Sequence, residues 1–201
     1  MRTVKFWQIK PEIRILGVDD GPFEADHQGK VPLVGVVFRG GRWLDGVMVT
    51  EIEKDGMDVT DRLIEMLVRS RHLGQLRVLM VDGVTFAGFN VLDVRRVFRK
   101  TSLPVVVISR EVPVMADIRK ALRHLPRWRE RWRIIKATGR IYPVATKSQG
   151  RSIYIQPVGI KREDAERIVR LSSTRSLVPE PLRVAHLIAT AIVRGESYGR
   201  V

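Results

Sequence analysis

The chain has 201 residues, 44% of them hydrophobic, so it is long and apolar enough to fold as one globular domain over residues 1–201. It contains no cysteine, which excludes disulfides, thiolate nucleophiles and cysteine-based zinc sites. Lys and Arg outnumber Asp and Glu by 36 to 22, and the net charge of +14 favours a polyanionic partner such as nucleic acid. The apolar runs are too short to cross a bilayer, and the first residues soon turn polar without a signal-peptide core. We therefore expect a cytoplasmic location.

Apolar periodicity and turn signals predict strands and helices in a definite order along the chain. A strand is expected over 13–19, followed by a hairpin whose strands, 31–39 and 42–51, flank two glycines. The later predicted elements are helix 58–72, strand 76–82, helix 90–100, strand 103–109, helix 115–125, strand 152–156, and helices 161–171 and 180–194. An antiparallel meander followed by β-α-β units predicts an α/β fold with a mixed sheet and helices on both faces. This is the element order of the ribonuclease H-like fold.

Two aspartates close apolar runs that are expected to form neighbouring strands. Asp19 follows the run 13–18, and Asp82 follows the run 76–81. If these strands are parallel neighbours, both carboxylates emerge at the carboxyl edge of the sheet, where open α/β sheets bind ligands. There they repel each other unless a divalent cation neutralises them, and such a site suits metal-assisted cleavage of phosphodiester bonds. Each aspartate also precedes a glycine-containing turn, so each could instead be an ordinary turn residue.

Two further ionisable residues are candidates for the same site. Asp61 stands in the first turn of the predicted helix 58–72, where it could reach a metal or only stabilise the helix start; Asp58 is an alternative third carboxylate. His186 lies on helix 180–194 and could orient or protonate a reacting group, or it could be a histidine at the edge of an apolar face. The predicted catalytic set is Asp19, Asp61, Asp82 and His186, with the three aspartates as metal ligands.

A strongly basic segment spans residues 119–140 and contains a single acid, Glu130. Basic residues interspersed with aromatic residues are suited to nucleic acid, because the cations can contact phosphates while the rings stack on bases. The alternative is a solvent-exposed helix that binds nothing. For Trp128 and Trp132, four residues apart, we favour a core position. We expect phosphate contacts from Arg119, Arg123, Arg127, Arg129, Arg131, Arg133, Lys136 and Arg140.

Four stretches of the chain resemble endonuclease V, and more closely the small uncharacterised archaeal proteins related to it. They are Leu16-Gly17-Val18-Asp19, Val81-Asp82-Gly83, the segment from Tyr154 to Gly159, and the segment from Leu177 to His186. The Pro-Glu-Pro-x-Arg-x-Ala-His run within the last segment is the most specific. The four stretches occur in the family's order, and the segment from Leu16 to His186 that they span is most of the chain.

The resemblance implies a ribonuclease H-like fold and a metal-dependent nuclease. It implies metal ligands at Asp19 and Asp82, a third carboxylate near Asp61, and a site residue at His186. Members of the family use Mg²⁺ or Mn²⁺ to cleave DNA or RNA beside deaminated purines, chiefly inosine, and so take part in DNA repair.

Four parts of the sequence depart from the family pattern. Residues 49–56 hold neither an aromatic nor a proline where the family carries a strand-opening wedge, and residues 85–89 replace its His-Pro-Arg sequence. Ile108-Ser109-Arg110 stands where the family has a lysine after the fifth strand, and Asp61 is one methylene shorter than the family's glutamate. A second hypothesis is therefore a nucleic-acid-binding protein on the same fold that does not cleave. A third is an enzyme that uses the same carboxylates on a phosphate-containing small molecule.

Overall fold

The computed structural model describes residues 3–24, 26, 28–146 and 151–197. Within this part of the chain a mixed sheet of seven strands runs through the centre of the molecule, in the order β3-β2-β1-β4-β7-β9-β8. Its strands are β1 (Arg14–Asp20), β2 (Lys30–Arg39), β3 (Trp43–Glu53), β4 (Val78–Asp82), β7 (Val105–Ser109), β8 (Tyr142–Ala145) and β9 (Ser152–Val158). Strands β1, β4 and β7 are parallel neighbours, and the remaining pairs are antiparallel. The predicted mixed α/β sheet is therefore confirmed.

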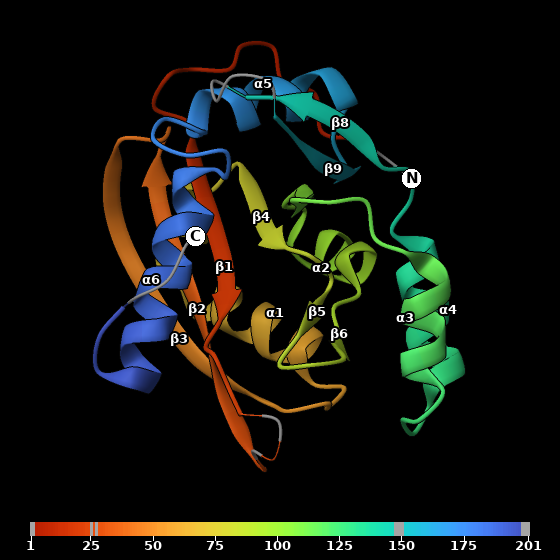
Figure 1. Cartoon of the computed structure of the whole chain (residues 1–201). Helices are drawn as coiled ribbons and strands as arrows, with labels where there is room; N and C mark the ends of the chain where they lie inside the picture. The colour runs from red at the N-terminus through yellow and green to blue at the C-terminus, as the bar shows by residue number, and fades with distance from the viewer. Residues whose placement is uncertain (1–2, 25, 27, 147–150, 198–201) are drawn as a thin grey trace.

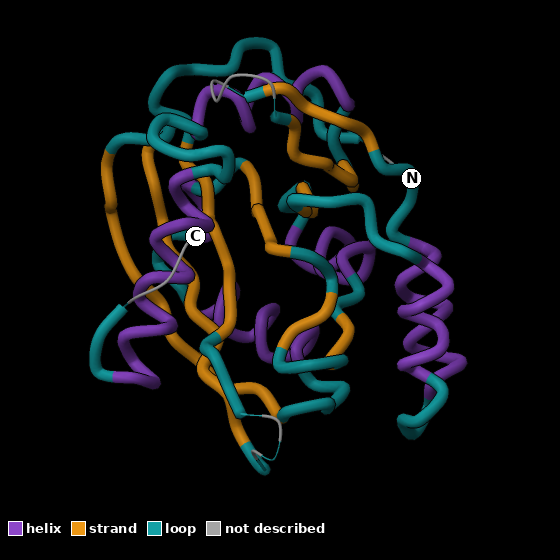
Figure 2. Tube along the Cα trace, in the orientation of Figure 1, coloured by secondary structure: helices purple, strands orange, loops and turns teal. Residues whose placement is uncertain are grey.

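Helices cover both faces of this sheet (Figure 1). They are α1 (Val59–Arg69), α2 (Val94–Thr101), α3 (Met115–Leu122), α4 (Trp128–Ala137), α5 (Arg162–Ser172) and α6 (Glu180–Arg194), with a short 3₁₀ turn, η1, at Leu73–Gln75. Helices α1 and α2 pack on one face, and α5 and α6 pack on the other. The pair α3–α4 stands beside the sheet, and a two-stranded ribbon of β5 (Thr85–Phe86) and β6 (Asn90–Val91) lies between the pair and α1 (Figures 1 and 2). Among the described residues no helix is long and apolar enough to cross a membrane.

The interior positions of β1, β4 and β7 are buried on both faces, because helices cover both faces of the sheet. In β4, Leu79 and Val81 pack in the cluster with α1 and α2, whereas Val78 and Met80 pack in the cluster with α5. Burying both sets of side chains is the main favourable contribution to folding.

Helix α6 lies unusually close to β1. A Cβ built on Gly17 would stand 2.3 Å from the carbonyl carbon of Pro181, so only glycine fits at this crossing. The close approach brings the middle of α6 against the end of β1.

Three predicted helices have boundaries that differ by three or more residues in the structure. The helix predicted over 58–72 ends at Arg69. The prediction of helix 90–100 is wrong at its start, because Asn90 belongs to β6 and α2 begins only after Asp93, whose carboxylate accepts a hydrogen bond from the Arg96 amide. The helix predicted over 115–125 ends at Leu122, and a second helix follows after Arg127, whose φ of 55° breaks the helical path.

Candidate active site

Asp19 and Asp82 lie at the carboxyl ends of β1 and β4. The two strands are paired in parallel, with Val18 opposite Val81, so the aspartates that follow stand beside each other. In β1, Leu16 and Val18 face α1 and α2. Because neighbouring residues in a strand point to opposite faces, Asp19 points toward α6, and by the same alternation in β4 so does Asp82.

His186 reaches this pair from the second turn of α6. Its Nδ1 lies 2.9 Å from Oδ2 of Asp19, and the other Asp19 oxygen accepts a hydrogen bond from the Asp20 amide at 2.9 Å. This hydrogen bond, followed by the charges of Asp19 and Asp82, raises the pKa of His186 above 6.5, against burial and Arg110, which lower it. Asp19 itself is only 7% exposed. The structure thus brings together three of the four residues predicted for the site.

The negative charge of Asp82 is poorly compensated. Burial, and then the charge of Asp19, raise the pKa of Asp82 to about 6, although Arg110 and His186 lower it. Arg110 follows the last residue of β7 and is a positive group within reach of both Asp82 and His186. The signal that could have assigned Arg110 to the site is its place directly after a central parallel strand.

Asp20 is a third carboxylate near this edge, and it is not among the residues predicted for the site. It points to the face opposite Asp19, where its Oδ2 accepts a hydrogen bond from the Ala87 amide at 2.7 Å. Burial and then the charge of Asp19 raise the pKa of Asp20 to about 7. The doublet Asp19-Asp20 at a strand end was the available signal.

Asp61 lies outside this group. It stands on α1, its side chain is 61% exposed, and it forms an ion pair with both terminal nitrogens of Arg96. The charges that shift the pKa values of Asp82 and His186 do not include Asp61. Asp58, the alternative, is also occupied elsewhere, since it accepts a hydrogen bond from Asn90 Nδ2 at 2.6 Å. The structure therefore does not support the predicted third carboxylate at either position.

The chemistry of the donor set fits a hard divalent cation. Asp19 and Asp82 present carboxylate oxygens from the same face of the sheet. The pKa of Asp82 is raised first by burial and then by the charge of Asp19, and a bound cation would offset both effects. Within the described part of the chain, no group of three or more Asp, Glu, His or Cys side chains is arranged to hold an ion. Mg²⁺ is commonly bound by only one or two carboxylates together with waters and substrate phosphates, so this pair is sufficient for it.

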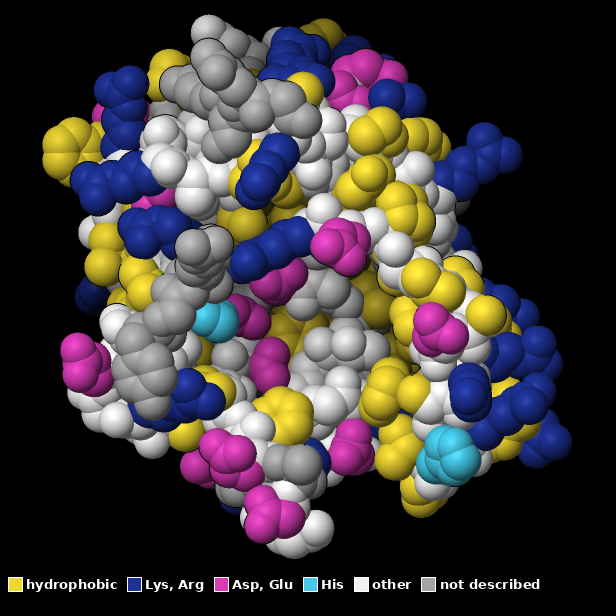
Figure 3. All heavy atoms as spheres, viewed as in Figure 1, with side chains coloured by type: hydrophobic (Ala, Val, Ile, Leu, Met, Phe, Trp, Pro, Cys, Tyr) yellow, Lys and Arg dark blue, Asp and Glu magenta, His cyan; other side chains and the backbone are white. Residues whose placement is uncertain are grey.

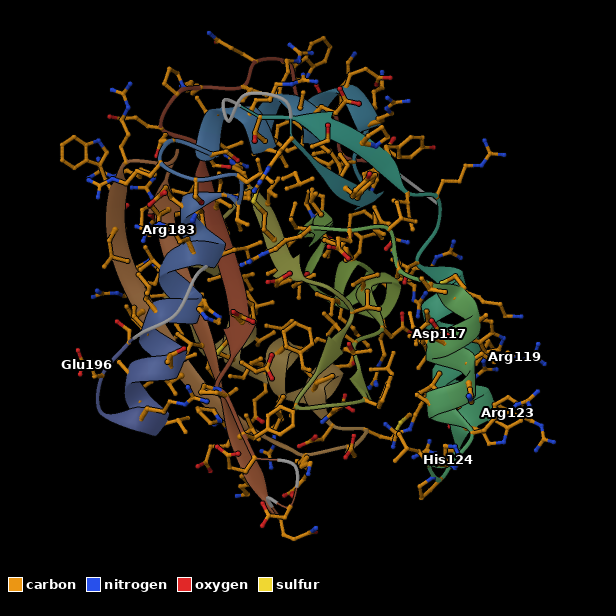
Figure 4. All side chains as sticks on the ribbon, in the orientation of Figure 1. Asp117, Arg119, Arg123, His124, Arg183 and Glu196 are labelled. Carbon is orange, nitrogen blue, oxygen red and sulfur yellow. The ribbon has the colours of Figure 1, made fainter. Side chains whose placement is uncertain are left out.

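The basic segment forms the α3–α4 pair at one side of the molecule. Lys and Arg side chains crowd its outer surface, whereas acidic side chains gather on the face between α3–α4 and α6 (Figure 3). Arg119 and Arg123 point away from the sheet (Figure 4). The predicted phosphate-binding residues that are exposed here are Arg119, Arg123, Arg127, Arg129, Arg133, Lys136 and Arg140.

Arg131 is the exception in this segment. It is only 2% exposed, and its guanidinium donates hydrogen bonds to the backbone carbonyls of Asp55, Gly56, Phe89 and Pro126. Burial lowers the pKa of its guanidinium below the usual range of an arginine. The prediction that Arg131 contacts phosphate is therefore wrong, because its guanidinium is buried and its donors are directed at four loop carbonyls of the protein itself.

The two tryptophans of α4 are partly buried, as predicted. Trp128 and Trp132 pack against the cluster of Val91, Leu122 and Ile135, which attaches α3–α4 to the ribbon. Their outer surfaces are covered by cations, with Arg129 over Trp128 at 4.8 Å from the ring centroid.

Comparison with known proteins places the chain among archaeal relatives. UPF0215 proteins from Methanothermobacter thermautotrophicus and Pyrococcus furiosus are 52% and 45% identical over 200 and 192 residues, covering 99% and 94% of this chain and 97% of each relative. A solved structure of a protein of unknown function from Archaeoglobus fulgidus superposes with a TM-score of 0.81 at 39% identity, over 91% of this chain and 99% of that one.

More distant solved structures share the fold. The catalytic domain of human endonuclease V superposes with a TM-score of 0.62 at 19% identity, over 96% of this chain and 89% of that domain. Argonaute from Marinitoga piezophila superposes with a TM-score of 0.54 at 12% identity, over 90% of this chain and 30% of Argonaute. The predicted ribonuclease H-like fold is confirmed. The model of the Endonuclease dU family matches residues 11–193, and the chain belongs to this archaeal, endonuclease V-like family.

Proposed function

We propose that the protein is a divalent-metal-dependent endonuclease that hydrolyses phosphodiester bonds in nucleic acid. The observation that carries the proposal is the pair of carboxylates, Asp19 and Asp82, held on one face of the sheet at the ends of parallel neighbouring strands. Membership of the Endonuclease dU family and the fold shared with endonuclease V support the same class of reaction.

Each residue of the site has a distinct role in this proposal. Asp19 and Asp82 would hold Mg²⁺ or Mn²⁺, and a bound ion of this kind activates water and stabilises the leaving oxygen. His186 holds a proton on Nδ1 against Asp19, fixes the orientation of that carboxylate, and is charged more readily than a free histidine. Arg110 is placed to attract the scissile phosphate toward Asp82.

Nucleic acid is the proposed partner, and the exposed cations of α3–α4 are its proposed backbone contacts. Lys and Arg side chains crowd the outer surface of this helix pair (Figure 3), which suits phosphate binding without base readout. Arg131 is left out of this set because it is buried.

The proposed substrates contain a deaminated base. The family name specifies dU, and endonuclease V of Ciona intestinalis has been crystallised with DNA that contains inosine. The first substrates to compare are therefore DNA strands that contain deoxyuridine or deoxyinosine. RNA strands that contain uridine or inosine are compared beside them.

The test is cleavage of end-labelled single and double strands with Mg²⁺ or Mn²⁺ by the parent protein and two variants. Asp82→Asn should reduce cleavage by more than about 100-fold, since loss of groups that only support a metal ligand already costs about 10–100-fold. Asp61→Asn is the matched control, because it removes an exposed carboxylate outside the site, and it should retain cleavage within about threefold. Equal cleavage by Asp82→Asn and the parent would refute the assignment.

A second candidate is a nucleic-acid-binding protein that does not cleave. The observation that favours it is that both oxygens of Asp19 already accept hydrogen bonds, one from His186 and one from the Asp20 amide. This candidate predicts salt-dependent binding that is the same with Mg²⁺ and with a chelator. Turnover that requires a divalent ion would exclude it.

A further inference from the structure

A pocket lies at the edge of the sheet where β1, β4 and β7 begin, opposite the edge that carries Asp19 and Asp82. It has a volume of about 710 Å³, within the range of roughly 300–1,000 Å³ that is typical of small-ligand pockets. Its walls come from the N-terminal segment 4–10, the start of β1, the turn around η1 and the loop 101–104. In Figure 1 the N-terminal segment crosses the end of the sheet from which the arrows of β1 and β4 point away. Asp19 and Asp82, at the arrowheads, take no part in this pocket, which we call the amino-edge pocket.

The amino-edge pocket combines an apolar floor with an exposed aromatic ring. Ile13, Leu76 and Leu103 are buried beneath it. Trp7 stands among its lining residues and is 85% exposed, with the Lys5 ammonium 3.5 Å from its ring centroid. A large flat ring beside an apolar floor suits stacking of a planar base.

The rim of the pocket carries positive charge that the protein does not neutralise. Among the described residues, Lys5, Lys10 and Arg77 line the pocket and form no ion pair. The acid in the lining, Glu12, is already 4.0 Å from Arg39. The nearby end of α2 has its own cations in its last turn, so the rim cations are not needed to balance that helix end. The excess charge therefore favours an anionic ligand.

We infer that the amino-edge pocket binds a nucleotide. The base would lie on the apolar floor beside Trp7, and the phosphate would face Lys5, Lys10 and Arg77. A free nucleotide and one nucleotide of a longer strand offer the same chemistry. This inference goes beyond the proposed nuclease, because the pocket is at the other edge of the sheet and its occupation requires no cleavage.

Tryptophan fluorescence of the full chain tests the inference with AMP, UMP and a short oligothymidylate as probes. We expect quenching by a nucleotide probe, and we expect Trp7→Phe to lose it. Arg77→Glu should weaken binding about tenfold, as expected for one lost charge-assisted contact. Arg71→Glu is the matched control, since it changes an exposed arginine that does not line the pocket by the same charge, and it should weaken binding less than about threefold. Lys10→Glu repeats the test if Arg77→Glu does not fold.

The probes also separate the possible sources of the ligand. Quenching by AMP or UMP indicates that the ligand is a free nucleotide, and quenching by the oligonucleotide alone indicates that it is part of a strand. Both results support nucleotide binding in the amino-edge pocket. Absence of quenching by all three probes, or equal effects of Arg77→Glu and Arg71→Glu, would overturn it. Inorganic phosphate that competes as well as AMP would show a simple anion site and would also overturn it. Asp82→Asn should bind these probes as the parent does, so failure of the nuclease proposal would be seen separately.

Discussion

His186 and Asp19 are 167 positions apart in the chain, yet Nδ1 of one lies 2.9 Å from Oδ2 of the other. The contact exists because α6 crosses β1 at Gly17, two residues before Asp19, without an intervening side chain. It connects the C-terminal helix to the end of the first strand. A nearly buried carboxylate is thereby given a partner that fixes its orientation.

Replacement of His186 by Gln should impair cleavage without removing the metal site. If the imidazole only orients Asp19, the loss in kcat should be about 10–100-fold, and if it also transfers a proton the loss should reach about 10²–10⁴-fold. The measurement is kcat and Mn²⁺ affinity of the variant beside His72→Gln, which changes another half-buried histidine that does not contact Asp19. Equal activity of His186→Gln and His72→Gln would rule out a role for His186.

The stability of the metal-free protein should fall as the pH rises from 5 to 8. Burial and neighbouring charge raise the pKa of Asp20 to about 7 and of Asp82 to about 6, from 3.8, so the folded state holds these protons more tightly than the unfolded chain. The contribution of both groups is therefore greatest at low pH and is lost through about pH 6 and 7. His186 acts in the same direction, because its pKa is raised above 6.5.

The Asp82→Asn variant isolates the contribution of Asp82 to the pH dependence of stability. At pH 8 the metal-free variant should melt on the order of 5 °C above the parent, because a buried charge is gone, and the difference should fade toward pH 5. Mg²⁺ or Mn²⁺ should raise the melting temperature of the parent at pH 8 but raise that of the variant much less. Melting curves with a chelator and with either ion decide this, and a difference that is independent of pH would contradict it.

The order and pairing of the central strands could be predicted from the sequence, but several side-chain positions could not. Apart from Arg14 and Arg77 near their starts, the runs 13–18 and 76–81 carry no charged or polar side chain, which is typical of strands covered on both faces. The parallel pairing of these strands brings Asp19 and Asp82 together. In contrast, Asp61 resembles any acid in a first helical turn. Its ion pair with Arg96 depends on the packing of α1 beside α2, which local sequence does not encode.

Arg131 is a second residue whose position could not be predicted from the local sequence. In the sequence it is one of many arginines in a basic segment, and nothing local separates it from Arg129 or Arg133. Its burial follows from carbonyls of two distant loops, around residues 55 and 89, that need donors once α4 packs over them.

Arg131→Lys should therefore destabilise the protein far more than the same change at Arg133. A lysine carries its three donors on one nitrogen and cannot span the four carbonyls that the three guanidinium nitrogens of Arg131 reach. The acceptors left without a donor should reduce the free energy of unfolding by about 2–4 kcal/mol. Arg133→Lys, exposed on the same helix, should change it by less than about 0.5 kcal/mol. Urea denaturation of both variants makes the comparison, and similar midpoints would show that the Arg131 contacts contribute little.

Gly17→Ala should disturb the fold and the site together. The added Cβ would lie 2.3 and 2.4 Å from the carbonyl carbon and oxygen of Pro181, and because these are backbone atoms α6 must shift away from β1. We expect a loss of about 1–3 kcal/mol in the free energy of unfolding and a longer distance from His186 to Asp19. Gly74→Ala is the control, since a Cβ there meets nothing within 4 Å.

Whether the close packing of α6 on β1 at Gly17 affects cleavage through His186 can be measured by combining two variants. If Gly17→Ala lowers cleavage by moving His186, then adding His186→Gln to it should cost much less activity than His186→Gln costs in the parent. Independent effects would mean that the close crossing at Gly17 supports only packing, and that the orientation of Asp19 does not depend on the position of α6.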